Sequence, residues 1–343
     1  MTLDQAETRP HHEPLARTCH TAEGPAVNIP ERLRILVIGA HPADIFDQSG
    51  GTMAHHVKRG DWVGCVVLTH GARVHDKVVV SEMFHRDRVP VGEELEKVIA
   101  ARTSIKGNEV REACRILGVS DLYFMDVDDS VLLLNEALIR RLARLIRKTR
   151  PNIIITHYPK EDGGISSPHA ITGQMVLFAR NLAMYPDGED DTKPHRIAQM
   201  FFWGQGGAPI RTGLWHAEGG HSCDVLIDIT DVIELKLKAM DTIESQGYAG
   251  NYARKRLEST DGAWGKAGGV PYAESFISLY SSTHYYLPLS PINLAHSMQS
   301  DQERLIRISY RTPSSYEPYQ PPQGCAGGNG GVIPSKAGVA PGG

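Results

Sequence analysis

Residues 35–56 read ILVIGAHPADIFDQSGGTMAHH, and this stretch decides the fold of the chain. It begins with an unbroken apolar run, residues 35–40, which is typical of a strand covered on both faces of a parallel sheet. His41 follows at once and Asp44 three residues later, and the glycine pair at positions 50–51 then starts a helical pattern. The stretch therefore predicts a strand, a turn that carries two possible metal ligands, and a helix.

The core of the chain continues to alternate short apolar runs with helical patterns. The expected strands are residues 34–40, 62–71, 121–127, 151–157, 198–204 and 224–230. The expected helices are residues 50–60, 108–119, 135–150, 171–185 and 231–246. Strands that alternate with helices form a mainly parallel sheet with helices on both faces. We therefore predict an α/β fold, a Rossmann-like three-layer α/β/α arrangement.

The domain organisation follows from the same pattern and from composition. The chain has 343 residues, and we expect one catalytic domain over residues 31–290. The polar residues 1–30 are expected to be a flexible leader, and the Pro/Gly-rich residues 312–343 a disordered tail. Residues 74–105 form a long charged insertion after the second strand, which we interpret as a possible lid.

Bulk composition excludes several classes of protein. The net charge is -4, so no basic surface argues for nucleic acid as a partner. No stretch approaches the roughly 18 apolar residues of a membrane span, and the leader lacks the apolar segment of a secretory signal. The five cysteines form no CxxC pair, which favours reduced thiols. We therefore expect a cytoplasmic enzyme with an anionic or sugar-like small molecule as substrate and with neither nucleic acid nor membrane as a partner. A homo-oligomer is compatible with the sequence.

Chemically capable side chains follow several of the expected strands. They are His41, Asp44, His70, Arg73, the run Asp126–Asp129 and His157. Ligands of open parallel sheets bind outside the carboxyl ends of the strands, so we expect these groups to share one edge. Arg73 is a candidate to bind a substrate carboxylate, because guanidinium groups bind carboxylates in a bidentate manner. The alternative is a surface arginine that pairs with Asp76.

The spacing of His41 and Asp44 suits a metal site on a first helical turn. A catalytic zinc site needs about three His, Asp or Glu ligands and one open position. The third ligand has to come from another strand end, and the candidates are His157 and His169. Spacing alone leaves open the alternative that the histidines only satisfy buried backbone groups. Zn²⁺ is the expected cofactor, although Fe²⁺ accepts a similar His/Asp set.

The segment AHPADIFDQSGG resembles the opening motif of the PIG-L/LmbE superfamily of zinc-dependent deacetylases, which reads A-H-P-D-D before a glycine pair. The later segment SSPHAITG, residues 166–173, loosely matches the family's H-P-D-H, and the similarity extends over about residues 33–285. This resemblance implies the family fold and implies that His41, Asp44 and His169 are the zinc ligands.

Two residues that assist catalysis in the family are replaced in this chain. The general base of A-H-P-D-D falls on Ala43, and the histidine that helps to stabilise the oxyanion falls near Ser166, which we expect to face the substrate. Alanine cannot transfer a proton, so another group has to replace it. We consider Asp47, His157, Glu161 and Asp162 as replacements.

The H-x-A-D form of the motif resembles one branch of the superfamily, the 4-oxalomesaconate hydratases. Further parallels are LTHGAR, ITHYPKED and SQGYAGNYARKR followed by YAES. Hydration of a double bond releases no amine, so the loss of an aspartate at position 43 is less damaging. We therefore predict a zinc-dependent hydratase of a small unsaturated oxo-carboxylate, with His157, Asp47 and Asp162 as catalytic groups. The alternatives are an N-deacetylase of an amino sugar or related amine, and a catalytically impaired binding homologue.

Overall fold

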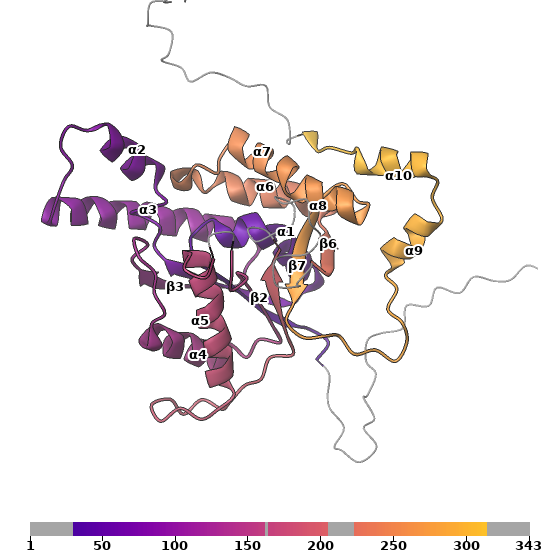
Figure 1. The fold of residues 1–343 in the computed structure, drawn as a ribbon, viewed down its shortest axis with the longest axis horizontal. Helices are drawn as coiled ribbons and strands as arrows, with labels where there is room; N and C mark the ends of the chain where they lie inside the picture. Colours follow the sequence, from indigo (N-terminus) through magenta and orange to yellow (C-terminus); the bar gives the residue numbers. More distant parts are fainter. Residues whose placement is uncertain (1–29, 162–163, 205–222, 314–343) are drawn as a thin grey trace, which may run out of the picture.

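The computed structural model describes residues 30–161, 164–204 and 223–313 (Figure 1). The strands are β1 Arg34–Gly39, β2 Trp62–Thr69, β3 Asp121–Val127, β4 Ile153–Thr156, β5 Gln199–Trp203, β6 Val225–Asp228 and β7 Ala273–Ser278. The helices are α1 Asp44–Arg59, α2 Lys77–His85, α3 Glu93–Leu117, α4 Glu136–Thr149, α5 Pro168–Ala183, α6 Ile233–Asp241, α7 Asn251–Ser259, α8 Asp261–Gly268, α9 Pro291–Ser297 and α10 Asp301–Ile308. Two 3₁₀ helices, η1 Thr230–Val232 and η2 Glu244–Gln246, flank α6.

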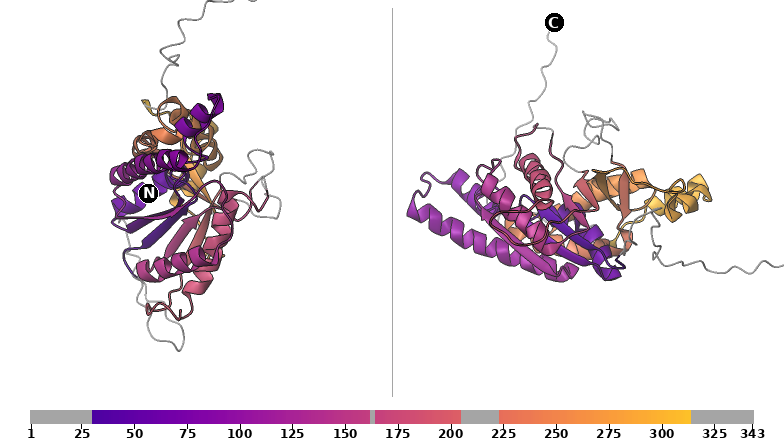
Figure 2. Two further views of the ribbon diagram at one scale, coloured as in Figure 1. Left: turned by 90° about the vertical axis from the view of Figure 1, so that its left-hand side faces the viewer. Right: turned by 90° about the horizontal axis from the view of Figure 1, so that it is seen from below.

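The strands form one seven-stranded sheet in the order β3-β2-β1-β4-β5-β7-β6. The neighbours from β3 to β5 pair in parallel, and β7 runs antiparallel to β5 and β6. Helices cover both faces (Figure 2). One apolar core joins the sheet to α1, α3, α6 and α7, and a second joins its other face to α4 and α5. The prediction of a three-layer, mainly parallel α/β fold is confirmed.

The register of the central strands brings their carboxyl ends level with one another. Ile38 of β1 pairs with Val66 of β2 on one side and with Thr156 of β4 on the other. The residues that follow these strands therefore emerge at one edge of the sheet, as expected. His41, His70 and His157 are the histidines placed there in this way.

The structure differs from the sequence prediction in the length and number of helices. The predicted helix 108–119 is only the last part of α3, and the possible lid, residues 74–105, consists of α2 and the first part of α3. Helix α1 begins at Asp44, earlier than the predicted residue 50, and contains a break at Ser49. Beyond residue 250 the structure contains α7 to α10 and β7. Hydrophobic periodicity and turn residues alone did not give the bounds of these elements. Within the described residues, no helix has both the length and the apolar character needed to cross a membrane.

Candidate metal centre

The turn after β1 and the start of α5 bring three possible metal ligands together. His41 follows β1 and Asp44 opens α1, so the tight turn between strand and helix holds both. His169 is the second residue of α5, whose start is defined by Pro168 and by the Ser167 side chain, which accepts a hydrogen bond from the Ala170 amide at 3.0 Å. His41 and His169 are 128 residues apart in the sequence, yet all three residues meet at the carboxyl edge of the sheet.

The donor atoms of these residues form a compact triangle. His41 Nδ1 lies 3.2 Å from His169 Nε2 and 3.3 Å from Asp44 Oδ2, and the third side of the triangle, from His169 Nε2 to Asp44 Oδ2, is 3.6 Å. Ligand bonds of 2.0–2.1 Å in a tetrahedral zinc site place neighbouring donors about 3.3 Å apart. The triangle therefore fits a small divalent cation. The His41 and Asp44 side chains are buried while His169 is 29% exposed, so the open side faces solvent next to His169.

The carboxylate and the histidines of the triangle shift each other's pKa. Burial would raise the pKa of Asp44, yet the adjacent His169 and His41 hold it well below its usual value. Burial opposes protonation of His169, but the Asp44 carboxylate, and then Glu161, raise its pKa to about 10. The carboxylate of Asp44 and a proton on His169 thus stabilise each other's charge. Metal binding has to displace this proton.

A second layer of side chains orients the donors. Glu161 Oε1 lies 2.7 Å from His169 Nδ1, so the carboxylate accepts the Nδ1 proton and leaves Nε2 to face the metal position. Two backbone hydrogen bonds, of 2.9 and 2.7 Å, join Glu161 to Gly164. Metal-bound histidines commonly bond a carboxylate in this way. The donor set, its spacing and its support therefore suit a metal.

His157 lies behind Asp44, away from the open side. Its Nε2 is 3.1 Å from both the Ala40 amide and Asp44 Oδ2, and its ring stacks on that of His169 at 4.2 Å. Burial, followed by the nearby His169, lowers the pKa of His157 to about 4, so the ring is neutral at physiological pH. The sequence prediction has this ring move a substrate proton, and the structure leaves it only 3% exposed.

The other predicted site residues differ in their burial and in the side chains that they pair with. Asp47 is 3% exposed, and its carboxylate accepts three hydrogen bonds of 2.7–3.0 Å from Arg256. Ser166 is exposed on the loop before α5. Asp162 lies outside the described residues. Arg73 pairs with Asp128 and with Glu96, and the alternative partner Asp76 pairs with Arg102.

One histidine close to the donors escaped the sequence analysis. The His75 ring packs on the His41 ring with centroids 3.8 Å apart, and it lies 3.5 Å from the carboxylate of the buried Asp129. The only signal for His75 was its place in the loop that also carries His70 and Arg73. His70, Asp128 and Asp129 form a second group with metal-ligand spacing. Their acceptor atoms, however, already receive backbone and arginine hydrogen bonds, which indicates a loop anchor.

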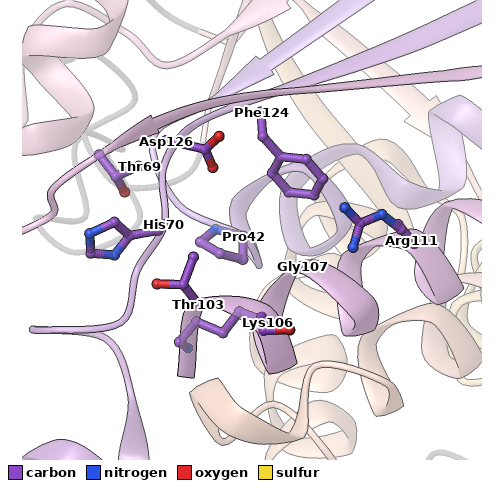
Figure 3. A pocket seen from close by; sticks show the side chains of 10 residues that line it. Pro42, Thr69, His70, Thr103, Lys106, Gly107, Arg111, Phe124 and Asp126 are labelled. Atoms are coloured by element: carbon purple, nitrogen blue, oxygen red, sulfur yellow. The ribbon is translucent and has the colours of Figure 1, made fainter. Parts of the chain in front are cut away.

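A cavity of about 190 Å³ lies on the β2–β3 side of the motif (Figure 3). Pro42, which separates the two ligands of the first motif, forms part of its wall, and Lys106 and Arg111 of α3 lie across from Asp126. The β2–β3 register shifts between Val67 and Thr69, and Asp126 has φ 53 there. Such a bulge re-aims a side chain, here towards the cavity.

Comparisons with known proteins agree with this geometry. The family model "PIG-L: GlcNAc-PI de-N-acetylase" matches residues 36–179. A diacetylchitobiose deacetylase of Thermococcus kodakarensis is 27% identical over 62% of this chain and 70% of its own length. A 4-oxalmesaconate hydratase of Pseudomonas putida is 29% identical over 66% of this chain and 78% of its own length. The crystal structure of the 4-carboxy-2-hydroxymuconate hydratase GalB of Pseudomonas putida KT2440 has a TM-score of 0.57 at 21% identity, covering 75% of this chain and 100% of that one.

Six further matched relatives are 1D-myo-inositol 2-acetamido-2-deoxy-alpha-D-glucopyranoside deacetylases, of whose length the chain spans 54–62%. The matched relatives thus support the deacetylase alternative better than the predicted hydratase, and those named here are enzymes and not binding proteins. The fold, the first motif and these matches agree with one another. The chain is therefore an enzyme of the PIG-L/LmbE superfamily, whose members among its relatives are deacetylases and a hydratase.

Proposed function

We propose that this protein is a metal-dependent N-deacetylase that releases acetate from an N-acetylated amino sugar or a related amine. The observation that carries the proposal is the donor triangle of His41, Asp44 and His169, with sides of 3.2–3.6 Å and one exposed face. The names of most matched relatives describe the same reaction class. Zn²⁺ is the metal that this donor set suits best, since zinc accepts two imidazoles and a carboxylate and leaves a fourth position for substrate or water.

The residues of the chain have separate parts in this reaction. A divalent metal held here supplies Lewis acidity and lowers the pKa of water. Asp44 and the two histidines provide the donors, and Glu161 fixes which nitrogen of His169 faces the metal. His157, neutral and stacked on His169, fills the space behind Asp44 and excludes water from that side.

The charges around the site favour a substrate without several carboxylates. Arg73, the predicted carboxylate ligand, already pairs with Asp128 and Glu96. Arg256 is engaged by Asp47. An oxo-tricarboxylate would have to compete with these internal partners, whereas a neutral sugar would not. The cavity beside Pro42 offers both acidic and basic hydrogen-bonding groups, which suits hydroxyl groups.

The test of this proposal is a substrate panel. Protein loaded with Zn²⁺ is incubated with N-acetylglucosamine, N,N'-diacetylchitobiose and unsaturated oxo-dicarboxylates and oxo-tricarboxylates. We expect acetate release from one or more N-acetyl sugars, lost on chelation and restored by metal. Hydration of an oxo-acid without acetate release from any sugar would overturn the deacetylase proposal.

A hydratase is the second candidate, and Ala43 is the observation that favours it. Ala43 occupies the position of the family's general base and is 1% exposed, within the apolar core. Amide hydrolysis needs a proton delivered to the leaving nitrogen, whereas hydration of a double bond has no leaving amine and needs its proton at a carbon atom, which a group other than residue 43 can supply. The relative with 29% identity is named as a hydratase.

The Ala43→Asp variant separates the two candidates. In a deacetylase that works without the usual base, the new carboxylate next to Asp44 should raise acetate release about 100-fold, the lower end of what general acid–base catalysis contributes. Ala43→Asn is the matched control, because it adds nearly the same volume without the charge. Thermal unfolding of both variants reports the cost of burying a polar side chain there. Equal activity of the two variants, or a loss in both, would contradict the deacetylase assignment.

A further inference from the structure

Helix α1, which carries Asp44, consists of two segments. Ser49 has φ -148 and ψ 19, a non-helical conformation, and its hydroxyl donates to the carbonyl of Ile45 at 3.0 Å. The metal-binding turn is thus a short first segment, residues 44–48, and it is not continuous with the rest of the helix. Every residue from Asp44 to Ala54 is buried. The place of the first segment therefore depends on what holds the break.

Glu274 of β7 binds the start of the second segment. The Gly51 amide donates to Glu274 Oε1 and the Thr52 amide to Oε2, each at 2.8 Å. The first amides of a helix have no partner within it, so the break creates donors that need an acceptor in the buried core. A carboxylate at a helix start also interacts favourably with the helix dipole. Glu274 therefore acts as the cap of an internal helix start.

Lys236 of α6 neutralises this carboxylate. Its ammonium lies 2.8 Å from Glu274 Oε1 and 2.9 Å from Asp261, and both Lys236 and Glu274 are completely buried. A buried carboxylate without a counter-ion is strongly unfavourable, so Lys236 is what allows Glu274 to remain charged there. The two side chains thus form one unit that joins α6, β7 and α1, and α1 packs against both of the other elements.

The glycine pair of the first motif makes this contact possible. A Cβ atom on Gly51 would lie 2.6 Å from the Cγ2 of Ile229, and one on Gly50 would lie 3.1 Å from the Cγ of Lys236. A larger residue at position 51 would therefore overlap Ile229, and one at position 50 would crowd the Lys236 side chain. The glycines therefore allow the break in α1 to approach Glu274 and Lys236 closely.

We propose that Glu274 is a positioning residue of the metal centre, with Lys236 as its counter-ion. By capping the second segment of α1, Glu274 sets where the first segment begins and so holds Asp44 at 3.3–3.6 Å from the donor nitrogens of His41 and His169. The assignment rests on the metal site of the proposed function and is independent of the reaction catalysed there. It gives a role to the YAES segment that contains Glu274.

The test is Zn²⁺ affinity, measured by competition with a chromophoric chelator at fixed pH. Glu274→Gln keeps the size of the side chain but has only one acceptor for two backbone amides. We expect affinity to fall about 10- to 100-fold, the range found when groups that orient metal ligands are lost. Glu109→Gln is the matched control, because Glu109 also caps backbone, accepting from the Ser245 amide at 2.9 Å, but serves η2 and not α1. The control should bind Zn²⁺ within about twofold of wild type.

Glu274→Asp keeps the charge and loses one methylene, and it serves if Glu274→Gln does not fold. We expect its affinity to lie between those of wild type and Glu274→Gln, since it can still bond one amide and Lys236. Thermal unfolding without metal separates stability from positioning. Wild-type Zn²⁺ affinity in a folded Glu274→Gln or Glu274→Asp variant would overturn the positioning role and leave the proposed function intact. A wild-type protein that binds no Zn²⁺ would overturn both.

Discussion

Replacement of His41 by alanine should abolish metal retention and reduce kcat/KM by at least about 10³-fold. His41 Nδ1 lies within 3.3 Å of both other donors, and only two protein donors remain without it. A metal at such a centre contributes several kcal/mol of transition-state stabilisation, and about 4 kcal/mol corresponds to 10³ in rate. Metal content by atomic emission and steady-state rates on the best substrate of the panel measure both losses.

The control for His41 comes from the same helix that carries Asp44. His55 of α1 pairs with Asp231 at the surface, and its side chain is 35% exposed. His55→Ala should keep one metal per chain and near wild-type turnover. A His41→Ala protein that still holds stoichiometric metal and turns over substrate would contradict the assignment of the centre, whatever its reaction proves to be.

Lys236→Met should lower the free energy of unfolding by about 3–5 kcal/mol, the cost of breaking a buried ion pair by removing one partner. The ammonium of Lys236 has two buried carboxylate partners, Asp261 and Glu274, and methionine would leave both without their cation. Burial already raises the pKa of Asp261, which indicates how costly its charge is. Urea unfolding at pH 8, with wild type and variant fitted to the same slope, measures the difference.

A surface pair provides the comparison for Lys236. Lys58 of α1 pairs with Asp231 at 2.9 Å, the same separation, but both side chains are more than half exposed. Lys58→Met should cost no more than about 1 kcal/mol, because solvent screens an exposed pair and replaces its hydrogen bonds. Similar small losses in the two variants would show that the buried network does not stabilise the fold, and would also weaken its role at α1.

Local pattern in the sequence was enough for the architecture and for two of the three donors of the proposed centre. The apolar runs and the turn signals between them predicted the parallel sheet, because a strand buried on both faces has to be apolar throughout. The position of His41 and Asp44 after a strand predicted a third donor from another strand end, because parallel strands end at a common edge. That rule left His157 and His169 open, and the family resemblance singled out His169. Both arguments depend on neighbours in the chain and on a general rule of topology.

Local sequence patterns could not predict which side chains pair with one another across long distances in the sequence. Asp47 was predicted as a catalytic group to replace the missing base, but its carboxylate pairs with Arg256, which lies 209 residues away in the sequence. His157 ends its strand as predicted, yet its ring is covered by Trp203 of β5 and by His169. No periodicity reports which charges neutralise each other or which ring covers another, since these depend on how helices and strands pack.

Sequence patterns were enough to predict an α/β sheet with His41 and Asp44 at its carboxyl edge, and the family resemblance singled out Ala43 as the departure from the motif. Only the tertiary structure decided which carboxylates remain available for chemistry. It paired Asp47 with Arg256 and Glu161 with His169, and it placed Glu274 at a break inside α1. The physical reason is that burial makes an unpaired charge costly, so each acid takes the nearest donor that the packed fold supplies.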